Sequence, residues 1–341
     1  MRCNLVYFLT SLLLCSPANS SERLELYLLS ERLMNKKIIS FQDAVQFNMK
    51  SRSQGFEGFN RDQKQDNKIS VNKAIFPILA FSNNINGGNL SQTVEVGDYT
   101  FVGEKDANAK SGLVVGAGLI LRTKKIIGRG KSLNFDFNAS LAAAPAHDWL
   151  KVRNETLVGC SKNHLKEWMF FDACANWAHN KREYSDTINK SISASLSKIF
   201  KYGRSFNEGS FTAKRDISSS LHQMQGTFAL NSLLPNGLKA NFDITSGKPV
   251  KDLLSLKYSV GMTINGLVRK KPITVSFRRT FYDGGKFLGI DRADTSQQLS
   301  VSYPFSNGFN VSIGYAKTVS TIHSFSSAGP IFSISLPVIS F

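Results

Sequence analysis

The sequence predicts an all-β protein, an antiparallel transmembrane β-barrel of about 12–14 strands with a short N-terminal helical segment. Three observations lead to this fold class. Long segments alternate apolar residues with small polar ones, turn dipeptides such as Asn236-Gly237 and Asn307-Gly308 separate them, and the chain ends on an aromatic residue, Phe341. Residues 1–20, 21–70 and 71–341 are expected to form a signal peptide, a periplasmic helical segment with a linker, and the barrel.

The first 20 residues have the features of a secretory signal peptide. A positive Met1-Arg2 start precedes the apolar run 5–15, and Ala18-Asn19-Ser20 supplies the small residues of a cleavage site. We therefore expect the mature chain to begin at Ser21, outside the cytoplasm. The sequence nowhere contains about 18 consecutive apolar residues, so it predicts no membrane-spanning helix.

Residues 21–70 predict two short helices followed by a linker. Ser40 and Asp43 form a capping-box pattern that opens a helix over residues 44–47, and residues 48–70 are polar and predict a linker. The first helix is indicated by leucines at helical spacing: Leu24, Leu28, Leu29 and Leu33.

From about residue 72 the period changes to two. Residues 254–265, for example, place large apolar side chains on one face and Ser, Lys, Gly, Thr and Asn on the other. Many such segments reach the 10 or so residues needed to cross a bilayer, whereas strands of a secreted β-sandwich, the alternative, average about 5–6. We expect strands near residues 72–84, 112–125, 132–144, 187–201, 208–219, 222–233, 237–247, 253–266, 271–283, 296–306, 308–320 and 330–341, with 93–103 and 165–178 as further candidates.

The C-terminal segment favours the membrane barrel over the sandwich. A terminal Phe341 that closes an amphipathic strand resembles the insertion signal of bacterial outer-membrane β-barrels. Phe332 and Ile334 lie on one phase of the alternation, however, while Ile339 and Phe341 lie on the other. A one-residue bulge at Pro337 would restore a continuous apolar face, since a bulge shifts the phase by one.

Cys160 and Cys174 are the cysteines that follow the signal peptide. In an oxidising compartment they predict a disulfide across a loop of about 15 residues, worth roughly 3 kcal/mol in the chain-entropy model. Free thiols and a metal site that includes His164 are the alternatives, but the spacing and the ligand number do not suit zinc. All three tryptophans also lie within residues 145–186, so we expect this segment to be an extracellular loop packed over or into the barrel mouth.

The small polar face of the strands predicts a water-lined lumen. The chain has 42 Lys and Arg against 25 Asp and Glu, and the basic clusters at 122–131 and 268–271 are expected to meet lipopolysaccharide rather than nucleic acid. Basic residues slightly outnumber acidic ones among the charged lumen candidates, which favours a weak anion preference. These candidates are Arg122, Asp136, Lys239, Asp243, Lys257 and Arg278.

The sequence predicts no enzyme. None of the five histidines lies beside a candidate nucleophile in the alternating pattern, and Ser306 is explained by the hairpin turn that follows it. We therefore expect no catalytic residues, no cofactor and no metal.

A family resemblance is carried by Phe81–Gly88 (FSNNINGG) and by the layout of residues 292–341. Both are similar to the opening and closing strands of the barrel domain of surface lipoprotein assembly modifiers. The resemblance covers residues 72–341 and implies a barrel that helps lipoproteins reach the cell surface. That family carries helical repeats before its barrel, and residues 21–70 are too short to hold three of them.

Two functions follow from the sequence. The first is an outer-membrane pore or transport channel for small polar or anionic solutes. The alternative, based on the resemblance, is a surface lipoprotein assembly or export factor with a lipoprotein cargo. Both imply outer-membrane lipid, lipopolysaccharide and the barrel assembly machinery as partners.

Overall fold

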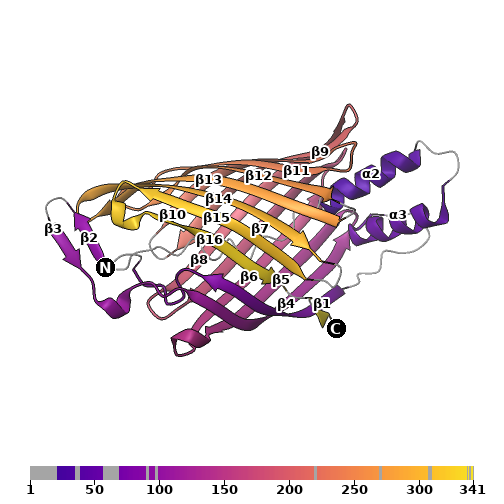
Figure 1. The fold of residues 1–341 in the computed structure, drawn as a ribbon. Helices are drawn as coiled ribbons and strands as arrows, with labels where there is room; N and C mark the ends of the chain where they lie inside the picture. Colours follow the sequence, from indigo (N-terminus) through magenta and orange to yellow (C-terminus); the bar gives the residue numbers. More distant parts are fainter. Residues whose placement is uncertain are drawn as a thin grey trace.

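The alternating segments fold into long antiparallel strands that close into a barrel with two helices at one end (Figure 1). This computed structural model describes residues 21–34, 39–56, 69–89, 92–96, 99–218, 221–268, 271–305, 309–335, 337 and 339–340. The main sheet has 15 strands in sequence order, and both final strands pair with the first. Since these two are segments of one strand, the barrel has 14 strand positions, which confirms the predicted fold class.

The barrel strands have the following bounds: β1 (Ile69–Ser82), β4 (Gly112–Gly128), β5 (Lys131–Ala144), β6 (Leu150–His164), β7 (Met169–Lys181), β8 (Asp186–Tyr202), β9 (Ser205–Ser218), β10 (His222–Leu233), β11 (Lys239–Gly247), β12 (Ser255–Val268), β13 (Lys271–Phe287), β14 (Ile290–Pro304), β15 (Asn310–Ser320), β16 (Ser327–Ser335) and β17 (Ile339–Ser340). A small hairpin, β2 (Thr93–Val96) and β3 (Tyr99–Val102), stands apart from the barrel sheet. The expected strand at 93–103 is therefore a hairpin outside the barrel wall.

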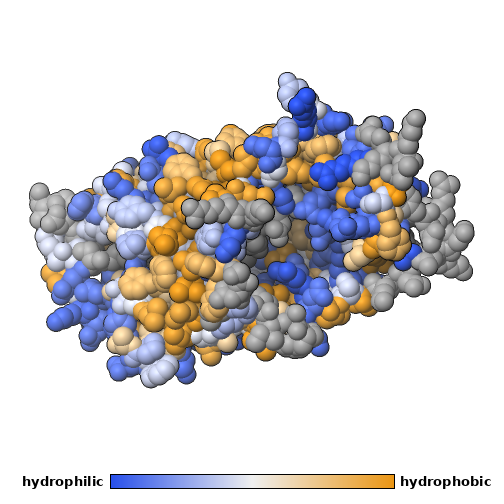
Figure 2. Space-filling view, turned by 45° about the vertical axis from the view of Figure 1, so that its right-hand side comes forward, coloured by the Kyte–Doolittle hydropathy of each residue, from blue (hydrophilic) through white to orange (hydrophobic). Residues whose placement is uncertain are grey.

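The outer wall of the barrel is apolar. Large hydrophobic side chains are exposed at alternate positions of many strands, and Figure 2 shows them spread over the wall with hydrophilic side chains toward the ends. A surface of this extent is stable in lipid and not in water, so the wall fits a transmembrane barrel and not a sandwich. Examples are Leu113, Leu119, Phe135, Leu141, Ile192, Leu196, Phe211, Phe228, Leu299, Val301, Ile313 and Tyr315.

The two ends of the barrel differ. The end that carries the helices and both ends of the barrel sequence has mostly short connections, such as 129–130 and 203–204, in which Gly130 and Gly203 adopt the positive φ of a tight turn. The opposite end carries the long connection 83–111, which holds β2, β3 and a 3-10 turn, η1 (Lys105–Ala107). We call these the inner and outer ends. In outer-membrane barrels the short turns face the periplasm, which matches the inner end.

Both predicted helices are present. α2 (Glu22–Met34) carries the predicted leucines, and α3 (Phe41–Ser53) begins at Ser40, whose hydroxyl accepts a hydrogen bond from the amide of Asp43 at 3.2 Å. α3 continues through residues expected to be linker, because Lys50 and Arg52 extend its polar face. The signal peptide and residues 57–68 of the linker lie outside the described residues. In the part of the chain that the structure describes, no helix is long and apolar enough to cross a membrane.

The segment 145–186 is not an extracellular loop. It forms β6 and β7, two full wall strands joined at the inner end, with a short 3-10 turn, η2 (Pro145–His147), before β6. Its tryptophans are dispersed: Trp149 lies in the β5–β6 connection at the outer end, Trp168 in the β6–β7 turn at the inner end, and Trp177 in β7. The predicted packing of this segment over the barrel mouth is therefore wrong.

The predicted irregularity at Pro337 is present. β16 pairs with β1 at Ile78↔Ser335, whereas β17 pairs at Ile75↔Ile339, so the C-terminal segment has one residue more than β1 between these two pairs. Pro337 itself has no strand structure. The extra residue brings Phe332, Ile334 and Ile339 onto one phase of the strand. Phe341, the predicted insertion signal, lies outside the described residues.

Two turn dipeptides have different outcomes. Asp283-Gly284, a pair typical of hairpin turns, falls inside β13, where the register with β14 shifts; the strands reverse instead at residues 288–289, where Gly289 has a φ of 88°. Asn236-Gly237 does lie in the β10–β11 connection, with φ of 80° at Gly237. Residues 306–308, including the Asn307-Gly308 turn, are outside the described residues.

Candidate functional site: a polar lumen closed at its inner end

The inward face of the barrel is lined by small hydroxyl and amide side chains. Neighbouring strands satisfy these groups in pairs: Thr212 donates to Ser195 at 3.0 Å, and the hydroxyls of Ser259 and Thr280 lie 3.0 Å apart. Similar contacts join Thr227 to Thr245 across β10 and β11. Such a lining is polar, and it suits water and small polar solutes.

Two predicted lumen residues, Arg122 of β4 and Asp136 of β5, occupy directly facing register positions. Lys239, at the start of β11, lies at the inner end, where its ammonium is 3.4 Å from a carboxylate oxygen of Glu25 in α2. Lys257 lies in a β-bulge at the outer end of β12, with its ammonium 2.9 Å from the carboxylate of Asp283. The three basic residues thus lie at different heights of the barrel and form no common cluster.

Arg278 and Asp243 form the best-defined polar contact of the lumen. Arg278 of β13 donates two hydrogen bonds to the carboxylate of Asp243 of β11, at 2.8 and 3.0 Å, and so reaches across β12. The contact passes over Gly261, where an added Cβ would come within 2.4 Å of an Asp243 oxygen. Three of the four predicted basic lumen residues therefore make ion pairs, which reduces the excess positive charge on which the predicted anion preference depends.

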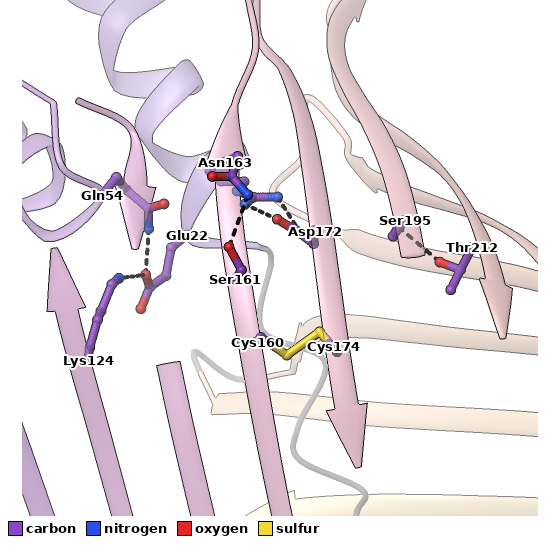
Figure 3. A network of polar contacts seen from close by, with 11 residues as sticks. Glu22, Gln54, Lys124, Cys160, Ser161, Asn163, Asp172, Cys174, Ser195 and Thr212 are labelled. Carbon is purple, nitrogen blue, oxygen red and sulfur yellow. Dashed lines mark hydrogen bonds and ion pairs between the residues drawn. A yellow bond between two sulfur atoms is a disulfide. The ribbon is translucent and has the colours of Figure 1, made fainter. Parts of the chain in front are cut away.

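The first turn of α2 crosses the inner mouth of the barrel. Arg23 donates two hydrogen bonds to Asp172 of β7 at 2.7 and 2.8 Å, while Glu22 lies 3.5 Å from Lys124 of β4 (Figure 3). Glu25 reaches Lys239 of β11, as described above. β4 and β11 are separated by six strand positions in either direction around the barrel, so they lie on opposite walls. These contacts between the helix and opposite walls were not predicted from the sequence.

Apolar packing supports the ion pairs. Leu24 is 1% exposed and packs against Phe170 of β7 and Ile199 of β8, in a cluster that also includes Phe206 and Leu233. On the same helix, Tyr27 meets the edge of the Trp168 ring at 4.9 Å between centroids, and burial, with a smaller contribution from Glu31, raises the pKa of its phenol. α2 is thus fixed by a hydrophobic face and by a charged first turn.

The end of α3 is attached to the inner turns of the barrel. The amide of Gly130 donates to the carbonyl of Gly55 at 2.8 Å, and the Phe56 ring meets the edge of the His164 ring at 5.0 Å. Lys50 of α3 also contacts Glu25 of α2. Both helices are therefore fastened to the barrel and to each other.

The first residues of the connection 83–111 fold into the outer mouth. Ile85 is 1% exposed and packs on Val114, Ala142 and Val152, whose positions face the lumen. The guanidinium of Arg182, in the β7–β8 turn, donates to the carbonyl of Asn84 at 2.7 Å, and burial lowers its pKa. The segment Phe81–Gly88, which carries the sequence resemblance, thus narrows the outer mouth.

The predicted disulfide between Cys160 and Cys174 is confirmed, but it lies in the barrel wall. The two residues face each other in the register of β6 and β7, with 4.2 Å between their Cα atoms (Figure 3). A Cα separation this short is typical of a non-hydrogen-bonded antiparallel pair. On β7, Cys174 follows Asp172 by two residues, so the disulfide lies on the lumen face beside the Arg23 contact.

No protein-family model and no curated protein sequence matches the chain. Among the described residues, no group of three or more His, Cys, Asp or Glu side chains could hold a metal ion.

Solved structures similar to the chain are β-barrels. OccAB4 of Acinetobacter baumannii is 6% identical and has a TM-score of 0.42, with 81% of this chain and 100% of that chain covered. OccK2 (OpdF) of Pseudomonas aeruginosa is 7% identical and has a TM-score of 0.43, with 80% and 98% covered. A second OccK2 structure, in complex with glucuronate, is 9% identical, with a TM-score of 0.42 and 81% and 99% covered.

Proposed function

We propose that the protein is an outer-membrane channel for small polar or anionic solutes and that α2 closes its inner mouth. The observation that carries the proposal is the closed barrel with an inward face of hydroxyl and amide groups and an outward face of apolar side chains. The secretory signal in the sequence supports an outer-membrane location. A polar lumen across a bilayer is a route for solutes that lipid excludes.

One basic side chain supports passage of anions. Arg122 lies on an inward register position of β4, is exposed, and makes no ion pair with another described residue, whereas Lys162 of β6 is half-buried and directly faces Asp172 of β7. A wall of small polar groups with a single exposed cation gives an anion weak contacts instead of one deep site. Weak binding favours passage over retention.

Conductance of the purified full chain in planar bilayers tests the proposal. In Asp172→Ala, the Arg23 guanidinium loses its partner, which destabilises the docked α2, so we expect conductance steps at least several-fold more frequent than in the unaltered chain. The control is Asp252→Ala, which removes an exposed ion pair with Lys286 at the outer end and should leave the steps unchanged. Silence of both the unaltered chain and Asp172→Ala would contradict a channel.

The alternative, a surface lipoprotein assembly or export factor, rests on the resemblance of Phe81–Gly88 and of residues 292–341. The same measurements separate the two functions. A silent barrel whose deletion removes lipoproteins from the cell surface would favour the alternative.

A further inference from the structure

A groove lies on the outward face of the barrel wall, near the outer end. It has a volume of about 1080 Å³ and crosses β1, β4, β5 and β6. Its floor follows a row of paired outward positions, in which Ile75 pairs with Leu119 and Ala117 pairs with Leu141. The small side chain of Ala117 leaves a depression between the larger neighbours.

The outward side chains at these paired positions are apolar on β1, β4 and β5 and become basic on β6 and β7. Leu141 of the floor pairs with Arg153, and Arg153 pairs in turn with Lys181. Lys151, two residues before Arg153 on the outward face of β6, completes the basic edge. Trp149, which is 60% exposed, stands at the top of the groove in the β5–β6 connection.

The charge of this edge is only partly neutralised by protein groups. The guanidinium of Arg153 lies 2.5 Å from a carboxylate oxygen of Glu155. Lys151 and Lys181 are exposed and make no ion pair with the other described residues. Asp148 and Glu183 also line the groove, so its edge carries charges of both signs, and Lys151 and Lys181 are its exposed cations without a paired carboxylate among the described residues.

We propose that this groove binds the phosphorylated, multiply acylated glycolipid of the outer leaflet, lipid A. An acyl chain lies on the floor at Leu119 and Leu141, and a phosphate contacts Lys151 and Lys181 at the edge. Trp149 packs at the interface between these two regions, where an indole has an apolar body and a polar N–H. The proposal rests on the outer-membrane location given above.

The charge and shape of the site select this occupant over others. A zwitterionic phospholipid would place a choline or ethanolamine cation among the lysines, whereas the phosphates of lipid A offer uncompensated negative charge. Sequence reasoning placed lipopolysaccharide contacts at 122–131 and 268–271. In the structure Arg122 and Lys124 occupy inward positions, and Arg129, Lys131, Val268 and Lys271 lie at the inner end, away from the outer leaflet.

Native mass spectrometry of the full chain in detergent, titrated with bis-phosphorylated lipid A, tests the proposal. We expect one bound lipid A, and about tenfold weaker binding to the double variant Lys151→Glu with Lys181→Glu. The matched control is Lys198→Glu, because Lys198 is an exposed lysine on an outward position of β8 at the inner end, and binding to it should be unchanged. Dephosphorylated lipid A and inorganic phosphate are titrated in parallel, and both should bind more weakly than lipid A.

Equal binding of lipid A to the double variant and to the unaltered chain would overturn the proposal. Equal binding of the dephosphorylated lipid would also overturn it, since the lysines would then have no role. Inorganic phosphate that binds as tightly as lipid A would show a phosphate site without a lipid groove and would likewise contradict it. Conductance of the same variants is measured independently, in bilayers without lipopolysaccharide. If the protein conducts normally but binds no lipid A, the lipid A site is rejected and the channel is not. If the protein is silent but binds lipid A normally, the channel is rejected and the lipid A site is not.

Discussion

Gly261 shows how a missing side chain positions a charged contact. The Arg278–Asp243 pair spans an intervening strand, and it can do so because residue 261 leaves free the space that a Cβ would fill, 2.6 Å from an Arg278 nitrogen. The alternation of residues 238–245 and 254–265 is sufficient to place Asp243 and Gly261 on the inward face. It does not reveal the pair, because Asp243 and Arg278 are 35 residues apart in sequence and meet only through strand order.

The Arg278–Asp243 pair makes the ion selectivity of the lumen testable. Asp243→Asn leaves the guanidinium without a countercharge on the lumen wall, so we expect the reversal potential in a KCl gradient to move toward anion selectivity. Asp283→Asn, which removes the partner of Lys257 at the outer end, should give a smaller shift because that pair is exposed to bulk water. A shift toward cations in Asp243→Asn would contradict the assignment of Arg278 to the conduction path.

The Cys160–Cys174 bond should stabilise the barrel measurably. The two cysteines are 14 residues apart, so in the chain-entropy model reduction costs about 3 kcal/mol. We expect a reductant to lower the temperature at which the folded band disappears in semi-native gel electrophoresis. The variant with Ser at both positions should lose its folded band at this lower temperature whether or not reductant is added. A double-Ser variant that is still shifted by reductant would show that another group is responsible.

Among the barrel strands, β6 is the one that the alternation of apolar and polar residues does not predict. Its outward positions begin with Lys151, Arg153 and Glu155 and end with Gly159, Ser161 and Asn163, so only Leu157 gives an apolar signal. The charged residues are tolerated because they lie at the headgroup level, and the small ones because Phe135 of β5 covers Gly159 at 3.3 Å from an ideal Cβ. Period-two reasoning fails where a lipid-facing row leaves the hydrocarbon region.

The closure of the mouth by α2 also escapes sequence reasoning. The leucine spacing of residues 24–33 predicts an amphipathic helix, yet it cannot say what the apolar face packs against. The contact between Arg23 and Asp172 joins residues 149 positions apart. One feature does indicate this placement: Arg23 and Glu25 lie on both sides of Leu24. Such a pattern suits a helix end that lies among opposite charges inside a polar cavity.

Docking of α2 depends on Leu24. Leu24→Ala removes the side chain that fills the space between Phe170 and Ile199, at a cost of about 2–5 kcal/mol for a buried leucine. We expect faster trypsin cleavage in α2 of the folded barrel. Met34→Ala is the control, because Met34 is 79% exposed and touches no core, and it should be cleaved at the rate of the unaltered chain. Equal cleavage of Leu24→Ala would show that the ion pairs alone hold the helix.

In the whole molecule, the strand order closes the barrel at an unequal seam. Among the residues that the structure describes, β1 shares 14 paired positions with β4, but three with β16 and two with β17. The fold class and most wall strands follow from alternation and turn residues, because each strand reports its own two faces. The strength of the seam cannot be predicted in this way, because it depends on where strands that are distant in sequence meet.

The seam is expected to be the weakest part of the wall. A disulfide across it, from Ala80→Cys with Ser333→Cys, should raise the melting temperature of the oxidised barrel by about several degrees. A matched disulfide between β1 and β4, from Ala74→Cys with Ile120→Cys, joins strands that are already well paired. It should raise the melting temperature less. Equal gains at both places would show that the seam opens no earlier than the rest of the wall.

The anchors of α2 on opposite walls have a mechanical consequence. The first turn of α2 contacts β4 on one wall, β11 on the opposite wall and β7 between them. It therefore links opposite sides of the inner rim. Flattening of the barrel cross-section along this line would compress these contacts, and widening would break them. The shape of the rim and the docking of α2 are thus coupled, so detachment of the helix would also free the rim to deform.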